Sequence, residues 1–161
     1  MKKAREGEVQ LAFDPADNDG PRVAFVGHIR TPWQPGDAPG NVAGARKRVA
    51  EEGGAFRIEL AEGYQPGIKD LSVGQHIIVL YWMDQARRDL IVQTPRHADA
   101  PRGVFSLRSP NRPNPIAMST VEIVSLDVEP GVIGIDALDC FDGTPIVDIK
   151  PWIATIDAPV A

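Results

Sequence analysis

The chain has 161 residues, a formal net charge of −5 and a single cysteine, together with 15 glycines and 15 prolines. This length supports one domain with a sizeable hydrophobic core, and a lone cysteine excludes a disulfide framework or a cysteine metal cluster within the chain. The acidic charge argues against broad contact with nucleic acid, because phosphate contacts supply most of that affinity, although a local basic patch can still bind it.

Short apolar runs between turn residues predict an all-β fold. One helix is expected at Ala45–Glu52, ended by Gly53 and Gly54, and a short helical turn near Gly67–Leu71. The chain has no G-x-G-x-x-G motif and no repeated strand–helix–strand unit, so a Rossmann sheet is not expected. The predicted strands are Val9–Phe13, Val23–Arg30, Phe56–Leu60, Ile77–Met83, Leu90–Gln93, Met118–Val128, Val132–Leu138 and Ile146–Ile149.

The predicted strand at Met118–Val128 changes face along its length. Val121 and Ile123 fall on one face, whereas Val124 and Leu126 fall on the other. Such a change of phase predicts a β-bulge or a passage between sheets, both of which are common in curved barrels. The sequence therefore predicts a β-barrel with one or two short helices, formed by residues 1–161 as a single domain.

The apolar runs are too short for a membrane span. The longest is Ile77–Met83, whereas a helix needs roughly 20 apolar residues to cross a bilayer. The first residues also lack the apolar stretch of a secretory signal peptide. We therefore expect a cytoplasmic protein that makes no membrane contact.

The segment Gly103–Met118 combines prolines with hydrogen-bond donors. Pro110, Pro113 and Pro115 fix three φ angles and remove three backbone donors, so the segment is neither a central strand nor a helix interior. The donor-rich side chains among them are Arg108, Asn111, Arg112 and Asn114. A guanidinium group can donate two parallel hydrogen bonds to two oxygens of one carboxylate or phosphate. The segment therefore predicts a stiff loop with two anion-binding guanidinium groups, those of Arg108 and Arg112. The alternative is a rigid surface turn whose arginines are solvated.

A second motif, Leu138–Trp152, gathers carboxylates around one turn. Asp142 and Gly143 are a strong turn signal, since glycine accepts positive φ and aspartate bonds its own downstream backbone. Asp139 and Asp148 flank this turn. Each carboxylate alone is typical of an ordinary turn or a solvated strand face, but together with the proline–arginine loop they indicate a site.

These two segments closely resemble the signature blocks of the TsaA-like (YaeB-type, TrmO-like) family. Its best-understood members are S-adenosylmethionine-dependent tRNA methyltransferases. The blocks stand here at Gly103–Ser119 and Leu138–Trp152, and the family's opening and middle strands correspond to Gly27–Trp33 and His76–Met83. The resemblance covers about residues 23–152 and implies a β-barrel that binds S-adenosylmethionine outside the Rossmann scheme.

The resemblance also implies roles for individual residues. Methyl transfer from a sulfonium is an in-line displacement in which the protein mainly aligns the reactants. The family's acceptor is the N6 nitrogen of a threonylcarbamoyl-adenosine beside a tRNA anticodon, and this nucleotide carries a carboxylate that would suit Arg112. The expected cofactor-binding residues are Phe105, Ser106, Leu107, Arg108, Ala117, Leu138, Asp139, Cys140, Phe141 and Thr144. The expected catalytic residues are Asp139, Asp142 and Arg112.

Basic residues on the predicted helix are the expected tRNA contacts, and solvated surface charge is the alternative. The resemblance adds a homodimer to the expected partners. The predicted substrate contacts are Arg46, Lys47, Arg48, Arg112 and Asn114, and a second basic cluster consists of Arg87, Arg88 and Arg96.

Three departures from the family pattern are visible. Ala117 replaces a glycine, Trp152 replaces a tyrosine, and Asp37–Asn41 stands where many members carry Pro-Arg-Gln. Two other functions stay open: a methyltransferase of this fold that acts on a small molecule, favoured by the acidic charge, and a cofactor-binding module without catalysis.

Other reactive side chains lack the neighbours that a site needs. No metal site is expected, because the histidines lack ligand spacing, and Cys140 has no adjacent base that would mark a nucleophile. The histidines are His28, His76 and His97.

Overall fold

The structure, a computed structural model, describes residues 3–95 and 98–159. Within these ranges the chain divides into two compact units. The small unit consists of Met1–Arg22 and Met83–Ala117, and the large unit consists of Val23–Trp82 and Met118–Ala161. Arg96 and His97 lie outside the described residues.

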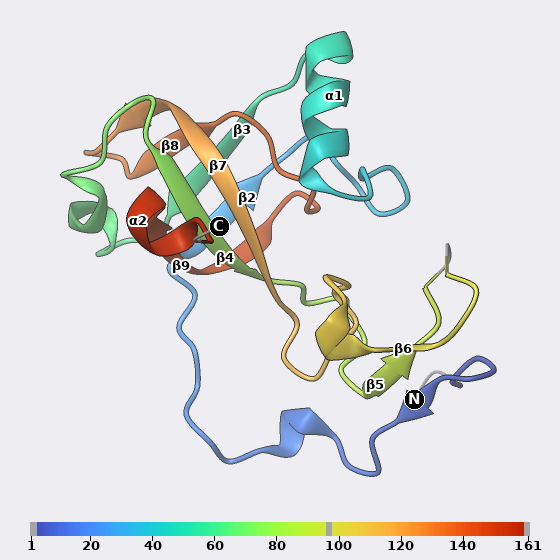
Figure 1. The fold of residues 1–161 in the computed structure, drawn as a ribbon. Helices are drawn as coiled ribbons and strands as arrows, with labels where there is room; N and C mark the ends of the chain where they lie inside the picture. The colour runs from blue at the N-terminus through green and yellow to red at the C-terminus, as the bar shows by residue number, and fades with distance from the viewer. Residues whose placement is uncertain (1–2, 96–97, 160–161) are drawn as a thin grey trace. The chain divides into compact units, whose positions relative to one another are not determined.

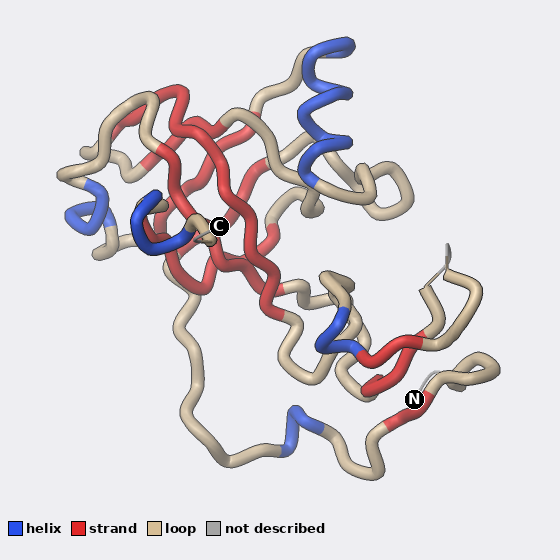
Figure 2. Tube along the Cα trace, viewed as in Figure 1, coloured by secondary structure: helices blue, strands red, loops and turns tan. Residues whose placement is uncertain are grey.

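Strands dominate the large unit, as Figures 1 and 2 show. They are β2 (Gly27–Arg30), β3 (Phe56–Leu60), β4 (His76–Trp82), β7 (Ile116–Asp127), β8 (Val132–Ile135) and β9 (Thr144–Pro151). The first two residues of β7 belong to the small unit. Neighbouring strands pair in the order β2-β3-β8-β7-β4-β9, and β9 pairs again with β2, so the sheet closes on itself. Closure removes the exposed edges at which another chain could add a strand.

Isoleucine side chains on facing strands form the centre of the core. Ile29 of β2 lies opposite Ile58 of β3, which in turn lies opposite Ile133 of β8, and all three are fully buried. Because successive strand residues point to opposite faces, a slip of one residue would expose this row, which therefore fixes the register. The ladder between β7 and β8 shifts between Ile123 and Ser125, which confirms the predicted bulge.

Helix α1 (Val42–Glu52) has residues suited to its two ends. The Asn41 side chain accepts a hydrogen bond from the Gly44 amide at 2.8 Å, and Gly53 ends the helix with a φ of 74°. The capping asparagine moves the start of the helix upstream of the predicted Ala45. The other helical segments of the large unit are η2 (Gln65–Ile68), close to the predicted turn, and α2 (Ala154–Asp157), which the sequence pattern did not indicate.

The small unit has little regular structure. Its elements are β1 (Val9–Gln10), η1 (Pro15–Asp17), β5 (Leu90–Gln93), β6 (Arg102–Gly103) and η3 (Val104–Ser106). The strands pair in the order β1-β5-β6. Among the described residues of this unit, Leu90 and Val104 are the large aliphatic side chains that are fully buried, so a small core is supplemented by polar contacts.

The all-β prediction with short helices is confirmed, and β3 and β5 match their predicted ranges. The strand predicted at Val132–Leu138 ends at Ile135, because the chain turns there toward the residues that follow β2. The expectation of a single domain stays a prediction. Among the described residues, no helix combines the length and apolar character that crossing a membrane requires.

Candidate functional site

The segment after β2 is bonded to the turn between β8 and β9. The Trp33 indole Nε1 donates to the Leu138 carbonyl at 2.7 Å, and the Thr31 hydroxyl donates to the Cys140 carbonyl at 2.8 Å. Trp33 and Thr31 are both buried. Two motifs more than 100 residues apart in the chain therefore form one structure within the large unit.

Backbone hydrogen bonds lock the same turn from the other direction. The Asp142 amide donates to the Trp33 carbonyl at 2.9 Å, and the Gly143 amide donates to the Ile29 carbonyl at 2.8 Å. The Asp142 carboxylate accepts the Thr31 amide at 3.2 Å. Gly143 has a φ of 80°, which only glycine adopts readily, so the Asp-Gly pair is required for this turn.

Asp139 is held by a buried hydroxyl chain. The Tyr81 hydroxyl lies 3.2 Å from the Asp139 carboxylate and 3.1 Å from the Ser119 hydroxyl. A carboxylate only accepts, so Tyr81 donates to Asp139 and Ser119 donates to Tyr81. Burial and the negative charge of Asp139 raise the pKa of Tyr81, which therefore stays protonated at neutral pH and keeps donating.

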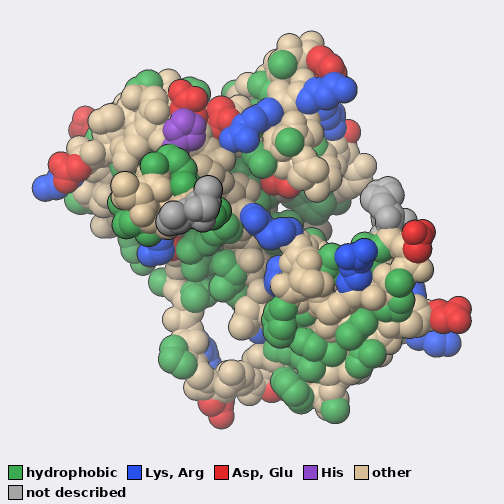
Figure 3. Space-filling view, viewed as in Figure 1, with side chains coloured by type: hydrophobic (Ala, Val, Ile, Leu, Met, Phe, Trp, Pro, Cys, Tyr) green, Lys and Arg blue, Asp and Glu red, His purple; other side chains and the backbone are tan. Residues whose placement is uncertain are grey.

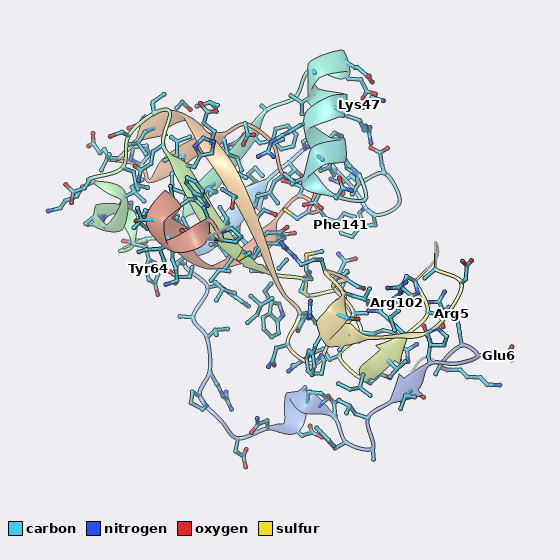
Figure 4. The ribbon with its side chains drawn as sticks, viewed as in Figure 1. Arg5, Glu6, Lys47, Tyr64, Arg102 and Phe141 are labelled. Atoms are coloured by element: carbon cyan, nitrogen blue, oxygen red, sulfur yellow. The ribbon has the colours of Figure 1, made fainter. Side chains whose placement is uncertain are left out.

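The other expected cofactor residues of this turn differ in burial. Leu138 and Cys140 are buried, Phe141 is half-buried, and Thr144 is buried with its hydroxyl donating to the Phe141 carbonyl at 2.7 Å. Burial raises the pKa of the Cys140 thiol to about 12, so the thiol stays protonated and is a poor nucleophile. Cys140 can thus contribute its backbone but not nucleophilic chemistry. Figure 4 labels Phe141 on this turn.

A hollow of about 490 Å³ opens beside this turn, and we call it the polar hollow. It is lined by Arg30, Thr31, Pro32, Ala55, Arg57, Glu59 and Asp142. Its volume falls within the range of ligand sites, about 300–1,000 Å³. The lining contains two cationic and two anionic side chains, which suits a ligand that carries both charges.

One carboxylate bridges both arginines of the polar hollow. Arg30 and Arg57 lie directly opposite each other on β2 and β3, and the Glu59 carboxylate accepts from both, at 2.8 Å and 2.7 Å. The hydrogen bonds from Arg30 and then Arg57 hold the pKa of Glu59 below its ordinary value. Asp142 adds a longer contact of 3.7 Å to Arg30. Glu59 is therefore ionised at neutral pH.

Sequence reasoning missed Arg30, Arg57 and Glu59. Their alternation with Ile29 and Ile58 signals only an outward-facing strand surface, which is typical of solvated charges. The cluster forms because the pairing register sets β2 against β3, and no local motif specifies that register. Asp148, the remaining carboxylate of the second motif, pairs with Lys150 at 2.8 Å.

The block Gly103–Ser119 begins in the small unit, where Arg112 has a structural role. Its guanidinium donates to the carbonyls of Val104, Leu107 and Ser109 at 3.1–3.4 Å. The predicted second anion-binding guanidinium group is thus already engaged by its own loop. A ligand role for Arg112 stays a prediction.

The remaining predicted residues of this block differ in exposure. Phe105 is 80% exposed, and Ser106 and Arg108 are also exposed. The Ser106 hydroxyl donates to the Gly103 carbonyl at 2.7 Å. Leu107 and Ala117 are half-buried, and Asn114 is exposed.

The basic run on α1 is divided between structural and solvent-facing side chains. Arg46 donates to Asp136 at 2.6 Å and to the Thr120 carbonyl at 2.9 Å. Arg48 stacks on the Trp33 ring at 4.4 Å from its centroid and donates to the Asp37 carbonyl. Lys47 is exposed on α1.

The described residues contain no cluster of three or more histidine, cysteine or acidic side chains that could hold a metal ion.

A family model described as the tRNA-methyltransferase O N-terminal domain matches residues 28–158. The chain belongs to this family. The match includes the bonded turn and the polar hollow of the large unit, together with the proline–arginine loop, and begins downstream of the first segment of the small unit.

Similar proteins carry names of two kinds. A probable S-adenosyl-L-methionine-binding protein of Archaeoglobus fulgidus is 40% identical over 133 residues, which are 83% of this chain and 34% of that protein. A probable S-adenosyl-L-methionine-binding protein VirR of Rhizobium radiobacter is 35% identical over 92% of this chain and 79% of its own length. A tRNA (adenine(37)-N6)-methyltransferase of Mus musculus is 47% identical over 42% of this chain and 15% of that protein.

The crystal structure of TrmO from Pseudomonas aeruginosa resembles this fold with a TM-score of 0.64 and 26% identity. The match covers 87% of this chain and 59% of that chain. This chain thus spans only part of the solved TrmO and about a third of the archaeal protein.

Proposed function

We propose that this chain is an S-adenosylmethionine-dependent methyltransferase domain whose acceptor is the N6 nitrogen of a modified adenosine beside a tRNA anticodon. The observation that carries the proposal is the family match over residues 28–158, which includes the turn between β8 and β9 with its buried hydrogen bonds. The name of the mouse relative, a tRNA (adenine(37)-N6)-methyltransferase, supports the choice of acceptor.

The charges of the large unit fit S-adenosylmethionine, which is a zwitterion with an additional sulfonium charge. Asp139 and Asp142 supply negative charge for the sulfonium and the ammonium group. The methionine carboxylate has two candidate partners: Arg108, as the sequence predicts, and the guanidinium groups of Arg30 and Arg57 in the polar hollow. When bound, the cofactor supplies a methyl group on a positively charged sulfur.

The chain's own contribution to the reaction is alignment and removal of a proton. The proposed proton acceptor is Asp139, because the Tyr81 hydroxyl fixes one of its oxygens at 3.2 Å and so orients the carboxylate. Asp142 is the second candidate and is held by the Thr31 amide. Arg112 and Asn114 stay proposed contacts of the acceptor nucleotide.

Calorimetric titration with S-adenosylmethionine tests cofactor binding. We expect binding in the low micromolar range or tighter, and a titration without heat or thermal shift would overturn the proposal. Arg108→Ala should weaken binding by about 1.5–3 kcal/mol if Arg108 holds the ligand carboxylate. An unchanged affinity would assign the carboxylate to Arg30 or Arg57. Arg102→Ala, another exposed arginine of the small unit, is the matched control.

The salt dependence of tRNA binding tests the acceptor. If lysines and arginines neutralise phosphates, affinity falls with a log–log slope of about −0.7 to −0.9 per contact. Lys47→Glu should weaken tRNA binding and leave cofactor affinity unchanged, whereas Lys69→Glu, on another exposed lysine, is the control. Arg46 is unsuitable for this test because it also bonds Asp136 and the Thr120 carbonyl. Flat salt dependence would favour a small-molecule acceptor.

A second candidate function is cofactor binding without catalysis. The relatives from Archaeoglobus fulgidus and Rhizobium radiobacter are both named as S-adenosyl-L-methionine-binding proteins. A single-turnover assay with labelled cofactor separates the candidates, using bulk tRNA from a deletion strain, which carries the modified adenosine but not its methyl group. Transfer of label to tRNA supports the methyltransferase, whereas tight binding without transfer supports the binding module.

We also propose a homodimer, because pairing of two copies would cover part of the exposed surface of a small domain. Light scattering that gives a monomer mass at working concentration would refute the dimer.

A further inference from the structure

A second hollow, of about 510 Å³, lies entirely within the small unit, and we call it the apolar hollow. It is lined by Leu11, Phe13, Asp14, Pro15, Asp17, Asn18, Ile91, Pro113 and Asn114. Its first wall, Leu11–Asn18, precedes the family match at residues 28–158, whereas the second wall belongs to the matched part. The hollow therefore joins a segment outside the family match to the proline–arginine loop.

One arginine fixes both walls of the apolar hollow. The Arg88 Nε donates to the Pro113 carbonyl at 2.7 Å, and its Nη2 donates to the Pro15 carbonyl at 3.2 Å. The Leu11 amide also donates to the Asp89 carbonyl at 2.7 Å, and the Asp14 side chain caps the short helix η1. The hollow is therefore shaped before any ligand arrives, which lowers the entropic cost of binding.

The lining combines flat apolar surfaces with a few polar groups. Phe13 is 66% exposed although it is a large aromatic side chain, and Pro15 and Pro113 add rigid apolar faces. Figure 3 shows hydrophobic side chains gathered over the unit that contains β5 and β6. The polar groups of the lining are the carboxylates of Asp14 and Asp17 and the amides of Asn18 and Asn114.

We propose that the apolar hollow binds a single unpaired nucleobase. A base stacks on an aromatic ring and on flat apolar faces, and amide and carboxylate groups read its edge. The two carboxylates repel a phosphate inside the hollow, so they select the base rather than the backbone. They also accept hydrogen bonds from exocyclic amino groups, which predicts a preference for adenine or cytosine over uracil.

This inference rests on the proposed function only where it takes the ligand to be a base of a tRNA loop. A free nucleoside also carries an unpaired base and could occupy the same hollow. Asn114 connects the hollow to the proline–arginine loop, which is proposed to contact the acceptor. The hollow would therefore hold a base of the same RNA other than the one that is methylated.

The test uses RNA stem-loops and free nucleosides that carry 2-aminopurine, whose fluorescence is quenched when it stacks. We expect quenching by the 161-residue chain without cofactor, and a roughly 5- to 150-fold weaker affinity in Phe13→Ala. Tyr64→Ala removes an aromatic side chain that is 42% exposed in the large unit and should leave affinity unchanged. If the protein quenches 2-aminopurine in the stem-loop but not in the free nucleoside, the ligand is a base within RNA. If it quenches both equally, the free nucleoside is the ligand.

Absence of quenching, or equal affinity in Phe13→Ala and the wild type, would overturn the inference. Arg88→Met gives an independent measurement, because loss of the two carbonyl bonds should loosen the walls and weaken binding while Phe13 is retained. A protein that methylates tRNA but shows no quenching refutes the base site and leaves the proposed function intact. A protein that quenches through Phe13 but transfers no methyl group refutes the proposed function alone.

Discussion

The large and small units are stabilised by different interactions. In the large unit, apolar side chains on paired strands are completely buried, as in the row Ile29, Ile58 and Ile133. In the small unit, Arg88 and Arg112 donate to backbone carbonyls, and Arg87 donates to the Asp89 carboxylate. The first kind of contact is non-directional and depends on area, whereas the second depends on the geometry of each hydrogen bond.

This difference has consequences for what each unit can do. A packed, closed sheet is a rigid support, so groups such as Asp139 and Asp142 are held at fixed positions on it. A unit that depends on individual hydrogen bonds is expected to exchange its amide hydrogens more readily than a closed sheet with a buried core. The variants below test this contrast.

The largest expected effect is at Ile58. Ile58→Ala removes a fully buried side chain between two other isoleucines, so the free energy of unfolding should fall by about 2–5 kcal/mol. Urea unfolding followed by tryptophan fluorescence, to which the buried Trp33 contributes, measures it. Val124→Ala, at a 53% exposed position of β7, should change stability by less than about 0.5 kcal/mol. Equal effects of the two variants would contradict a packed core in the large unit.

The same contrast explains how much of the fold the sequence predicted. Alternating apolar residues indicated β3, a continuous apolar run indicated most of β4, and a change of phase in the apolar pattern indicated the bulge in β7. The small unit has no such pattern, since an arginine can reach a carbonyl from many positions in the chain. Its sheet β1-β5-β6 and the segment η3 were therefore predicted in part or not at all.

The second effect is at Asp89 in the small unit. Arg87 donates to both Asp89 oxygens, at 3.0 Å and 2.8 Å, and this holds the pKa of Asp89 well below its ordinary value near 4. Because the folded pKa is lowered, the stabilisation is present at neutral pH and is lost as pH falls below about 4 toward the lowered pKa. Asp89→Asn should cost about 1.5–3 kcal/mol at pH 7.

Hydrogen exchange of the Leu11 amide, which donates to the Asp89 carbonyl, measures this loss in the small unit itself. The difference between wild type and Asp89→Asn should shrink as the pH is lowered from 5 to 3. Asp99→Asn, at an exposed aspartate of the small unit, is the control. A difference that is independent of pH would show that the pair does not contribute through its charge.

The site was predictable to a similar, limited degree. The signature blocks identified the turn at Asp139 and Asp142 because its glycine and aspartate are required locally. The roles of Arg46 and Arg112 were not predictable, because these side chains donate to the backbone carbonyls of Thr120 and Val104. Every residue has a backbone carbonyl, so the sequence does not indicate which one is the acceptor. A basic side chain in a motif therefore indicates a donor, while its acceptor depends on the tertiary structure.

A smaller effect is expected at Tyr81. Tyr81→Phe removes the hydroxyl between Ser119 and Asp139 and should lower the free energy of unfolding by about 0.5–1.5 kcal/mol. Since the pKa of Tyr81 is raised by burial, this contribution is present at neutral pH and is lost only above the ordinary tyrosine pKa near 10. If the hydroxyl also orients Asp139, cofactor affinity should fall, whereas Tyr64→Phe, at an exposed tyrosine, should change neither quantity.

The smallest effect is expected at Glu59. This variant tests whether ion pairs on the surface of the large unit stabilise it as strongly as the pair of Arg87 with Asp89 stabilises the small unit. Glu59→Gln removes the carboxylate that Arg30 and Arg57 share and leaves only the longer contact of Arg30 with Asp142, at 3.7 Å. All three side chains are partly exposed, so the loss should be only about 0.2–1 kcal/mol and should shrink at high salt. Because the pKa of Glu59 is lowered, the difference from wild type should vanish as pH falls through that lowered value.

The same variant should increase the affinity of the polar hollow for anions such as pyrophosphate, because two guanidinium groups lose their shared acceptor. Calorimetry with pyrophosphate at low salt measures this gain, and Glu62→Gln, at an exposed glutamate beyond the end of β3, controls for the change in net charge. A loss above about 2 kcal/mol, outside the range for exposed pairs, would show that Glu59 is as essential to the large unit as Asp89 is to the small one. An equal gain in both variants would assign the anion binding to overall charge rather than to the paired arginines.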